Sequence, residues 1–177
     1  MIKTIALLAL AALAGLLAYA ATRPDIFKVQ RSTHIQASLT KIHPLIHDLH
    51  QFNTWNPYNK KDPAMQASYE GPGSGPGALY RFKGNKDVGS GSISITAVQA
   101  DKITMALDMT EPFACHNIIE FSLQPQGDGT DVIWAMHGPS NFISKLMGVV
   151  FDMDKMVGRD FEAGLSSLKA LAETPGT

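Results

Sequence analysis

Hydrophobic and polar positions alternate along much of the chain beyond residue 26. The first such segment, 27–37, has the period of two that is typical of a half-buried strand. Further alternating or β-rich segments follow at 65–69, 78–83, 89–99, 102–109, 116–123 and 131–136. Short connections rich in turn-forming residues separate them, which favours antiparallel hairpins. The pattern predicts one strand followed, after an interruption, by about six antiparallel strands.

Helical spacing replaces this alternation in two places. The interruption after the first strand contains apolar residues at helical spacing behind the potential caps Ser38 and Thr40: Leu45, Ile46, Leu49 and Phe52. Residues 142–173 contain no proline and place a broad apolar face on one helix: Leu146, Val150, Met153, Val157, Phe161, Leu165, Leu168 and Leu171. Only the sheet is large enough to cover that face. We therefore predict an α+β domain over 27–173, in which the sheet wraps around one long carboxy-terminal helix and leaves a cavity.

The first 22 residues form a separate segment. Residues 5–21 carry no charge, and a helix of that length spans about 25 Å, at the short end of what a bilayer needs. We predict a membrane anchor within 1–22, helical over 4–22, with the domain on the periplasmic side of the inner membrane. Ala18-Tyr19-Ala20 also resembles a signal-peptide cleavage site, so secretion after cleavage near Ala20 is the alternative. The absence of a spacer before the first strand favours the anchor.

Composition excludes several classes of function. Acidic and basic residues are interspersed, with 15 Lys and Arg against 16 Asp and Glu, so there is no basic surface for nucleic acid. Cys115 is the only cysteine, which excludes an internal disulfide and a multi-cysteine metal site. His43, His47 and His50 lie opposite the apolar side of their helix, which indicates a polar surface rather than a zinc site. No metal or cofactor is predicted, and the oligomeric state is left open.

A glycine-rich segment at 70–77 invites comparison with phosphate-binding loops. Such loops open a helix, usually with a lysine and a serine or threonine following. Here a strand follows instead, and the glycines alternate with prolines. We interpret the segment as a structural connection.

Asp154 is the least expected residue of the carboxy-terminal segment. In a continuous helix it falls at the same angle as Phe161 and Leu165, where a carboxylate requires a hydrogen bond, an opposite charge or a cavity. One interpretation makes it a polar anchor or an acid/base at the end of the cavity. The other, which we favour, breaks the helix near Phe151, so that Asp152 becomes the N-cap and Asp154 a first-turn acid.

Several short motifs resemble the START-like helix-grip superfamily (SRPBCC), the polyketide cyclase/dehydrase and lipid-transport group, in a membrane-anchored subgroup. They are Trp55-Asn56-Pro57, Tyr69-Glu70-Gly71 with Gly77-Ala78, Gly89-Ser90-Gly91, Gly129-Thr130 with Trp134-Ala135-Met136, and 158–165 with Leu168-Lys169. The resemblance covers nearly all of 27–173 and consists of structural signatures rather than a catalytic set. It implies a helix-grip fold with an internal pocket for a lipid or another apolar small molecule.

The leading hypothesis for function is therefore a membrane-tethered, non-catalytic binding protein for such a molecule. The residues expected to line its cavity are Trp55, Tyr80, Trp134, Met136, Met153, Asp154, Val157 and Phe161. One alternative is a polyketide cyclase/dehydrase-like enzyme with Asp154 or His116 as the acid/base. Another is a protein-interaction domain with a filled cavity. No serine–histidine–aspartate set or carboxylate pair stands at a spacing that supports catalysis.

Overall fold

The strands of this protein form one antiparallel sheet. The computed structural model describes residues 2–174. Its seven strands are β1 (Ile26–Ile35), β2 (Gln66–Glu70), β3 (Leu79–Lys83), β4 (Ser90–Val98), β5 (Lys102–Glu111), β6 (Cys115–Gln126) and β7 (Gly129–Pro139). The order across the sheet is β1-β7-β6-β5-β4-β3-β2, so the first strand pairs with the last. Each strand lies close to a segment that the alternation predicts.

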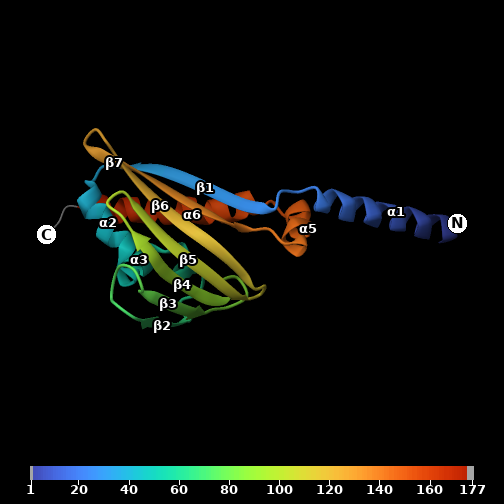
Figure 1. Ribbon diagram of the computed structural model, residues 1–177, viewed down its shortest axis with the longest axis horizontal. Helices are drawn as coiled ribbons and strands as arrows, with labels where there is room; N and C mark the ends of the chain where they lie inside the picture. The colour runs from blue at the N-terminus through green and yellow to red at the C-terminus, as the bar shows by residue number, and fades with distance from the viewer. Residues whose placement is uncertain (1, 175–177) are drawn as a thin grey trace.

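Six helices accompany the sheet in the described part of the chain. They are α1 (Ile2–Ala21), α2 (Leu39–His47), α3 (Leu49–Trp55), α4 (Pro57–Lys61), α5 (Phe142–Val150) and α6 (Met153–Glu173). Figure 1 shows α6 lying along the curved sheet, whereas α1 extends away from one end of it. The α+β helix-grip architecture predicted from the sequence is confirmed: an antiparallel sheet wraps around a long carboxy-terminal helix.

Side-chain caps divide the segment between β1 and β2 into three short helices. The carboxylate of Asp48 accepts hydrogen bonds from the backbone N–H groups of His50 and Gln51, which starts α3. Asn56 caps α4 in the same way, and Pro57 occupies the first helical position, where proline costs no hydrogen bond. These turns direct Trp55 inward, and its indole Nε1 donates to the carbonyl of Leu45 at 2.8 Å.

Residues 142–173 form two helices, as in the favoured interpretation of Asp154, and not the single continuous helix of the other interpretation. Helix α5 ends at Val150, Phe151 is extended (φ −118°, ψ 136°), and α6 begins at Met153. The carboxylate of Asp152 accepts a hydrogen bond from the backbone N–H of Lys155 at 2.9 Å, so it caps a new helix. A side chain that can bond the backbone in this way competes with helix continuation. The break agrees with the second interpretation of Asp154, which places it in the first turn of α6.

Close packing joins α6 to the sheet and to α4. The ring of Trp134 on β7 stacks on Phe161 of α6, with centroids 4.1 Å apart and planes 9° from parallel. Gly164 permits this approach, because a Cβ there would lie 2.6 Å from Cζ3 of Trp134 and 3.0 Å from Cδ of Pro57. The surrounding core includes Phe52, Trp55 and Phe121, all fully buried.

Apart from Lys3 and Thr4 in its first turn, helix α1 is apolar on every side, and it is almost entirely exposed. It is the one described helix long and apolar enough to cross a membrane, and a signal sequence near the N-terminus would have the same properties. Its last turn is different, because Ala20 is buried and α1 makes contacts with α5. Helix α1 therefore meets the remainder of the protein at α5.

Candidate ligand cavity

A cavity of about 410 Å³ lies between the sheet and the first half of α6. The sheet contributes side chains from β3 to β7, and helices α3 and α4 close one side. Most of the wall is apolar: Phe52, Met65, Tyr80, Phe82, Val88, Ile93, Leu107, Met109, Pro112, Ile119, Trp134, Met136, Met153, Met156, Val157 and Phe161.

Six of the eight residues expected around a cavity lie on its wall: Tyr80, Trp134, Met136, Met153, Val157 and Phe161. Trp55 does not. It is fully buried behind the wall, where its ring meets Trp134 edge-on at 5.7 Å between centroids. Trp55 thus supports a wall residue instead of lining the cavity. Its position depends on the α3–α4 turn, which periodicity alone does not fix.

Asp154 also lies away from the apolar cavity. Its carboxylate is 60% exposed and pairs with Arg31 of β1, with Oδ2 3.0 Å from Nη2. Arg31 Nη2 also donates to the backbone carbonyl of Asp154, and Nε donates to Glu162 at 2.8 Å. The Arg31 hydrogen bonds hold the pKa of the Asp154 carboxyl below its usual range. Asp154 therefore joins α6 to β1 as an ionised acid, which does not suit proton donation near neutral pH.

The pairing of Arg31 with Asp154 predicts a pH-dependent contribution to stability. Because the folded-state pKa of Asp154 is depressed, this contribution is present above the unfolded-state pKa of about 3.9 and is lost as the pH falls through the folded value. Arg31→Gln should therefore lower the free energy of unfolding at pH 7, and the difference from wild type should shrink below about pH 4. Urea unfolding at several pH values measures this difference.

Arg159→Gln is the matched control for that measurement, because Arg159 is exposed on α6, the helix that carries Asp154. It removes the same charge without touching the Arg31 contacts. If both variants lose the same stability at every pH, the Arg31 contacts contribute nothing specific to the fold.

His116, the other acid/base candidate, also lies outside the cavity. Successive residues of a strand point to opposite faces, and its neighbour Asn117 lines the cavity. The His116 ring is half exposed, and its Nδ1 lies 2.6 Å from Oδ1 of Asp108, its partner in the β5–β6 register. Neither acid/base candidate thus reaches the cavity.

Several polar groups gather where α4 and α6 meet the cavity, and of these the sequence singled out only Tyr80. Lys61 and Asp160 form an ion pair at 2.7 Å, and Tyr80 Oη donates to Oδ1 of Asn59 at 3.4 Å. Burial raises the pKa of Tyr80 to about 12, so its hydroxyl stays protonated and can donate a hydrogen bond at physiological pH. Burial also raises the pKa of the nearby Tyr58 phenol. Such a cluster can orient one polar end of a mostly apolar ligand.

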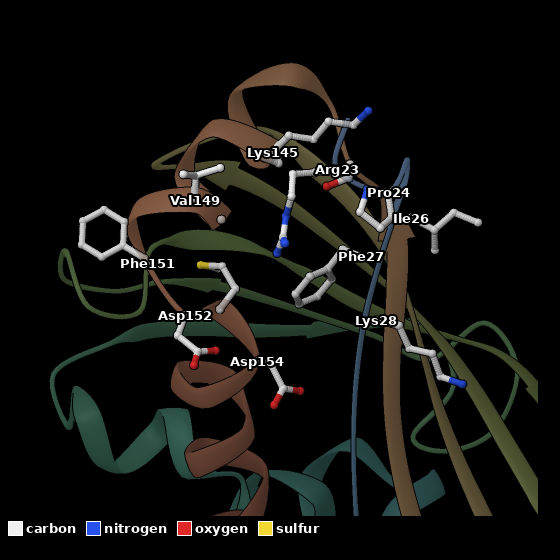
Figure 2. Close-up of a pocket in the computed structure, with 14 residues that line it drawn as sticks. Arg23, Pro24, Ile26, Phe27, Lys28, Lys145, Val149, Phe151, Asp152 and Asp154 are labelled. Atoms are coloured by element: carbon white, nitrogen blue, oxygen red, sulfur yellow. The ribbon is translucent and has the colours of Figure 1, made fainter. Parts of the chain in front are cut away.

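A second hollow lies outside the sheet–helix interior, between α5, the start of β1 and the first turn of α6. Its volume is about 580 Å³, larger than the apolar cavity. Figure 2 shows the Arg23 side chain extending into it, with Asp152 and Asp154 on the α6 side. We place the ligand site in the smaller cavity, because its wall is apolar and it lies between the sheet and α6.

The histidines of α2 and α3 make local contacts. His43 Nε2 lies 2.8 Å from the carbonyl oxygen of Gln99, and the His50 ring stacks on Tyr69. Within residues 2–174, no three histidine, cysteine, aspartate or glutamate side chains gather closely enough to hold a metal ion. The glycine-rich segment connects β2 to β3, as expected, with Gly71, Gly75 and Gly77 at positive φ.

The family model for "Polyketide cyclase / dehydrase and lipid transport" matches residues 27–173, which is most of the chain. The chain belongs to this family. The matched region includes the whole cavity wall and all but the first residue of the sheet. No protein of curated function shows significant sequence similarity to the chain.

Solved structures share the fold of this family member at low sequence identity. A Chromobacterium violaceum protein is 12% identical with a TM-score of 0.60, over 86% of this chain and 100% of its own. A protein solved as a dimer from Colwellia psychrerythraea is 17% identical with a TM-score of 0.56, over 84% and 97%. A major latex-like protein from Panax ginseng is 13% identical with a TM-score of 0.58, over 85% and 99%. At these identities the likeness establishes the fold alone.

Proposed function

We propose that this protein is a membrane-tethered binding protein that holds a lipid or another apolar small molecule between its sheet and α6. The observation that carries the proposal is the cavity of about 410 Å³ with its predominantly apolar wall. A volume of several hundred Å³ is typical of small-molecule sites, and each Å² of apolar ligand surface removed from water contributes roughly 25 cal/mol. Membership of a family described by lipid transport and polyketide chemistry supports the same class of ligand.

The polar cluster beside the cavity supports a ligand with one polar end. Asn59 is held by a hydrogen bond from its Nδ2 to the carbonyl of Asn53 at 2.8 Å, which fixes its amide beside the Tyr80 hydroxyl. Lys61 and Asp160 already neutralise one another. A carboxyl, hydroxyl or carbonyl group at this end would lie among the polar side chains of Asn59, Lys61 and Tyr80. The hydrocarbon part would contact Trp134, Met136 and Val157. The expected ligand is amphipathic and mainly hydrocarbon.

The membrane part of the proposal rests on α1. We propose that α1 is retained as a single-pass anchor of the inner membrane, with the folded part in the periplasm. Its contact with α5 and its short connection to β1 favour retention over cleavage near Ala20. Tethering would keep the cavity within reach of membrane lipid.

A binding role is favoured over the catalytic alternative. Asp154 and His116 both lie outside the apolar cavity. Asp154 pairs with Arg31, and His116 lies against the carboxylate of Asp108. A domain that only binds proteins would have little reason to maintain an unfilled apolar interior, since filled interiors are more stable.

Val157→Trp tests the proposal, because an indole in place of a partly buried valine occupies space that the ligand needs. The full-length variant in mild detergent should bind cis-parinaric acid, a fluorescent fatty acid, at least about tenfold more weakly than wild type. Leu171→Trp is the control, because Leu171 is exposed near the other end of α6. Native mass spectrometry of gently extracted wild-type protein should also show a co-purifying apolar molecule.

The binding proposal fails if wild-type protein neither carries an apolar molecule nor binds the probe. It also fails if Val157→Trp and Leu171→Trp bind the probe as well as wild type does, because the probe then lies elsewhere.

A further inference from the structure

We propose that α5 and the turn between β5 and β6 form a docking surface that rests on the lipid bilayer and brings the mouth of the cavity to the lipid. The occupant of this surface is the headgroup and upper acyl region of the bilayer that holds α1. The inference rests on the proposed function, since it takes α1 as a retained anchor and the cavity as the ligand site.

Exposed apolar side chains are concentrated at one end of the protein. Outside α1, nine large hydrophobic residues are exposed in the part of the chain that the structure describes. Six of them belong to α5 and its C-cap, to the start of β1 or to the β5–β6 turn: Phe142, Ile143, Met147, Phe151, Ile26 and Phe113. Single exposed apolar residues are ordinary, but a group of this kind marks an interaction surface.

Helix α5 exposes its apolar side chains and buries its charged one, which is the reverse of the usual arrangement. A helix that faces water exposes its charges and buries its apolar residues. Here the only charged residue, Lys145, is 11% exposed, and its Nζ lies 2.5 Å from Oδ1 of Asp25 in the segment between α1 and β1. Phe142, Ile143 and Met147 are left on the outside. This arrangement suits an apolar medium outside the helix.

The position of α5 relative to α1 identifies that medium. A helix of 20 residues spans about 30 Å, close to the thickness of the hydrocarbon core. Its last turn contacts α5, and Figure 1 shows α5 at the junction with the strands. With α1 across a membrane, α5 lies where the hydrocarbon meets the headgroups. Interfacial helices insert their apolar side chains at this depth.

The cationic side chains near the junction fit the same placement. Arg23 follows the end of α1 by two residues and extends into the hollow beside α5, as Figure 2 shows. Lys28 lines the same hollow. Arginine and lysine near the end of a spanning helix commonly place their charges among lipid headgroups. A surface that binds a protein could lie anywhere on the domain. A surface that binds the bilayer must lie next to the end of α1, as this one does.

The cavity opens beside this surface. Pro112 on its wall precedes Phe113 of the docking surface, and Met153 follows Phe151 by two residues. Met109 and Met156 also line this side, and Met156 is exposed. Methionine side chains are flexible and apolar, so they can part for a hydrocarbon chain. A ligand could therefore pass between bilayer and cavity without crossing water.

Site-specific fluorescence tests the docking surface. A cysteine is introduced by Leu13→Cys, Ile143→Cys or Leu171→Cys in a Cys115→Ser background and labelled with the environment-sensitive NBD fluorophore. The full-length proteins are placed in phosphatidylcholine vesicles whose acyl chains carry bromine, which quenches fluorophores inside the bilayer. We expect quenching at positions 13 and 143 and none at 171. Quenching at 13 without quenching at 143 overturns the docking proposal, and no quenching at 13 overturns the anchor and the docking surface together.

A kinetic experiment separates docking from binding. Ile143→Asp should slow the transfer of cis-parinaric acid from phosphatidylcholine vesicles to the protein by about tenfold, because a carboxylate resists entry into the interface. Its affinity for the probe in detergent should equal that of wild type, and Leu171→Asp should change neither quantity. If transfer by Ile143→Asp is as fast as by wild type, docking is overturned while binding stands. If wild type does not bind the probe in detergent, the proposed function fails, and the quenching pattern decides the docking surface.

Discussion

Replacing Trp134 with alanine is expected to lower the free energy of unfolding by about 3–5 kcal/mol. Trp134 is almost fully buried and links three parts of the core: it stacks on Phe161, meets Trp55 edge-on and lies 5.0 Å from Phe121 between ring centroids. Alanine would remove the apolar contacts of the indole and leave a void that these rings cannot fill without moving. The void would also merge with the ligand cavity, which Trp134 lines.

Urea unfolding of the full-length protein in mild detergent, followed by far-ultraviolet circular dichroism, measures this loss. Phe113→Ala is the control, because Phe113 is an exposed aromatic residue and its loss should change stability by no more than about 0.5 kcal/mol. A loss below about 1 kcal/mol for Trp134→Ala would mean that the rings around Trp134 contribute little to holding α6 on the sheet.

The strands of the sheet could be predicted from the sequence because the pattern that defines each strand lies within a few consecutive residues. In most of the strands, more buried residues alternate with more exposed ones, so the period of two survives in the sequence. The same alternation correctly put Trp134 and Met136 on one face, and both lie on the cavity wall. The pairing of β1 with β7 is not local, and no pattern in 27–37 predicts it.

The break between α5 and α6 shows where local reasoning becomes ambiguous. The apolar face of 142–173 continues through residues 150–153, so periodicity favours one helix. The capping side chain of Asp152 favours two. The contact between α5 and α1 adds a further tertiary constraint, and a helical wheel contains no information about it.

The candidate site could be predicted only for its apolar wall. Its polar cluster combines Asn59 and Lys61 of α4 with Tyr80 of β3 and Asp160 of α6. These residues are far apart in the sequence, and all but Tyr80 have the ordinary appearance of surface residues. The nearest sequence indication was Trp55-Asn56-Pro57, whose Asn56 caps α4 and so positions two members of the cluster. Trp55 itself was misplaced, because the same turn sends its ring behind the wall.

Replacing Gly164 with alanine is expected to destabilise the protein by about 1–2 kcal/mol, although alanine is the better helix former by about 1 kcal/mol. The added Cβ would lie 2.6 Å from a ring atom of Trp134 and 3.0 Å from Pro57, and both are buried. Trp134 cannot retreat, because Trp55 and Phe121 lie behind it. Overpacking at such a contact costs more than the gain in helix propensity, so α6 should move away from β7.

Gly148→Ala provides the opposite case within the same chain. Gly148 lies in α5, and a Cβ there would meet no atom within 4 Å. Its replacement should therefore raise the free energy of unfolding by up to about 1 kcal/mol, from helix propensity alone. Urea unfolding of both variants under identical conditions compares the two signs. If Gly164→Ala stabilises the protein as Gly148→Ala does, α6 is not seated against Trp134 as closely as described, and the cavity beside that contact has a different shape.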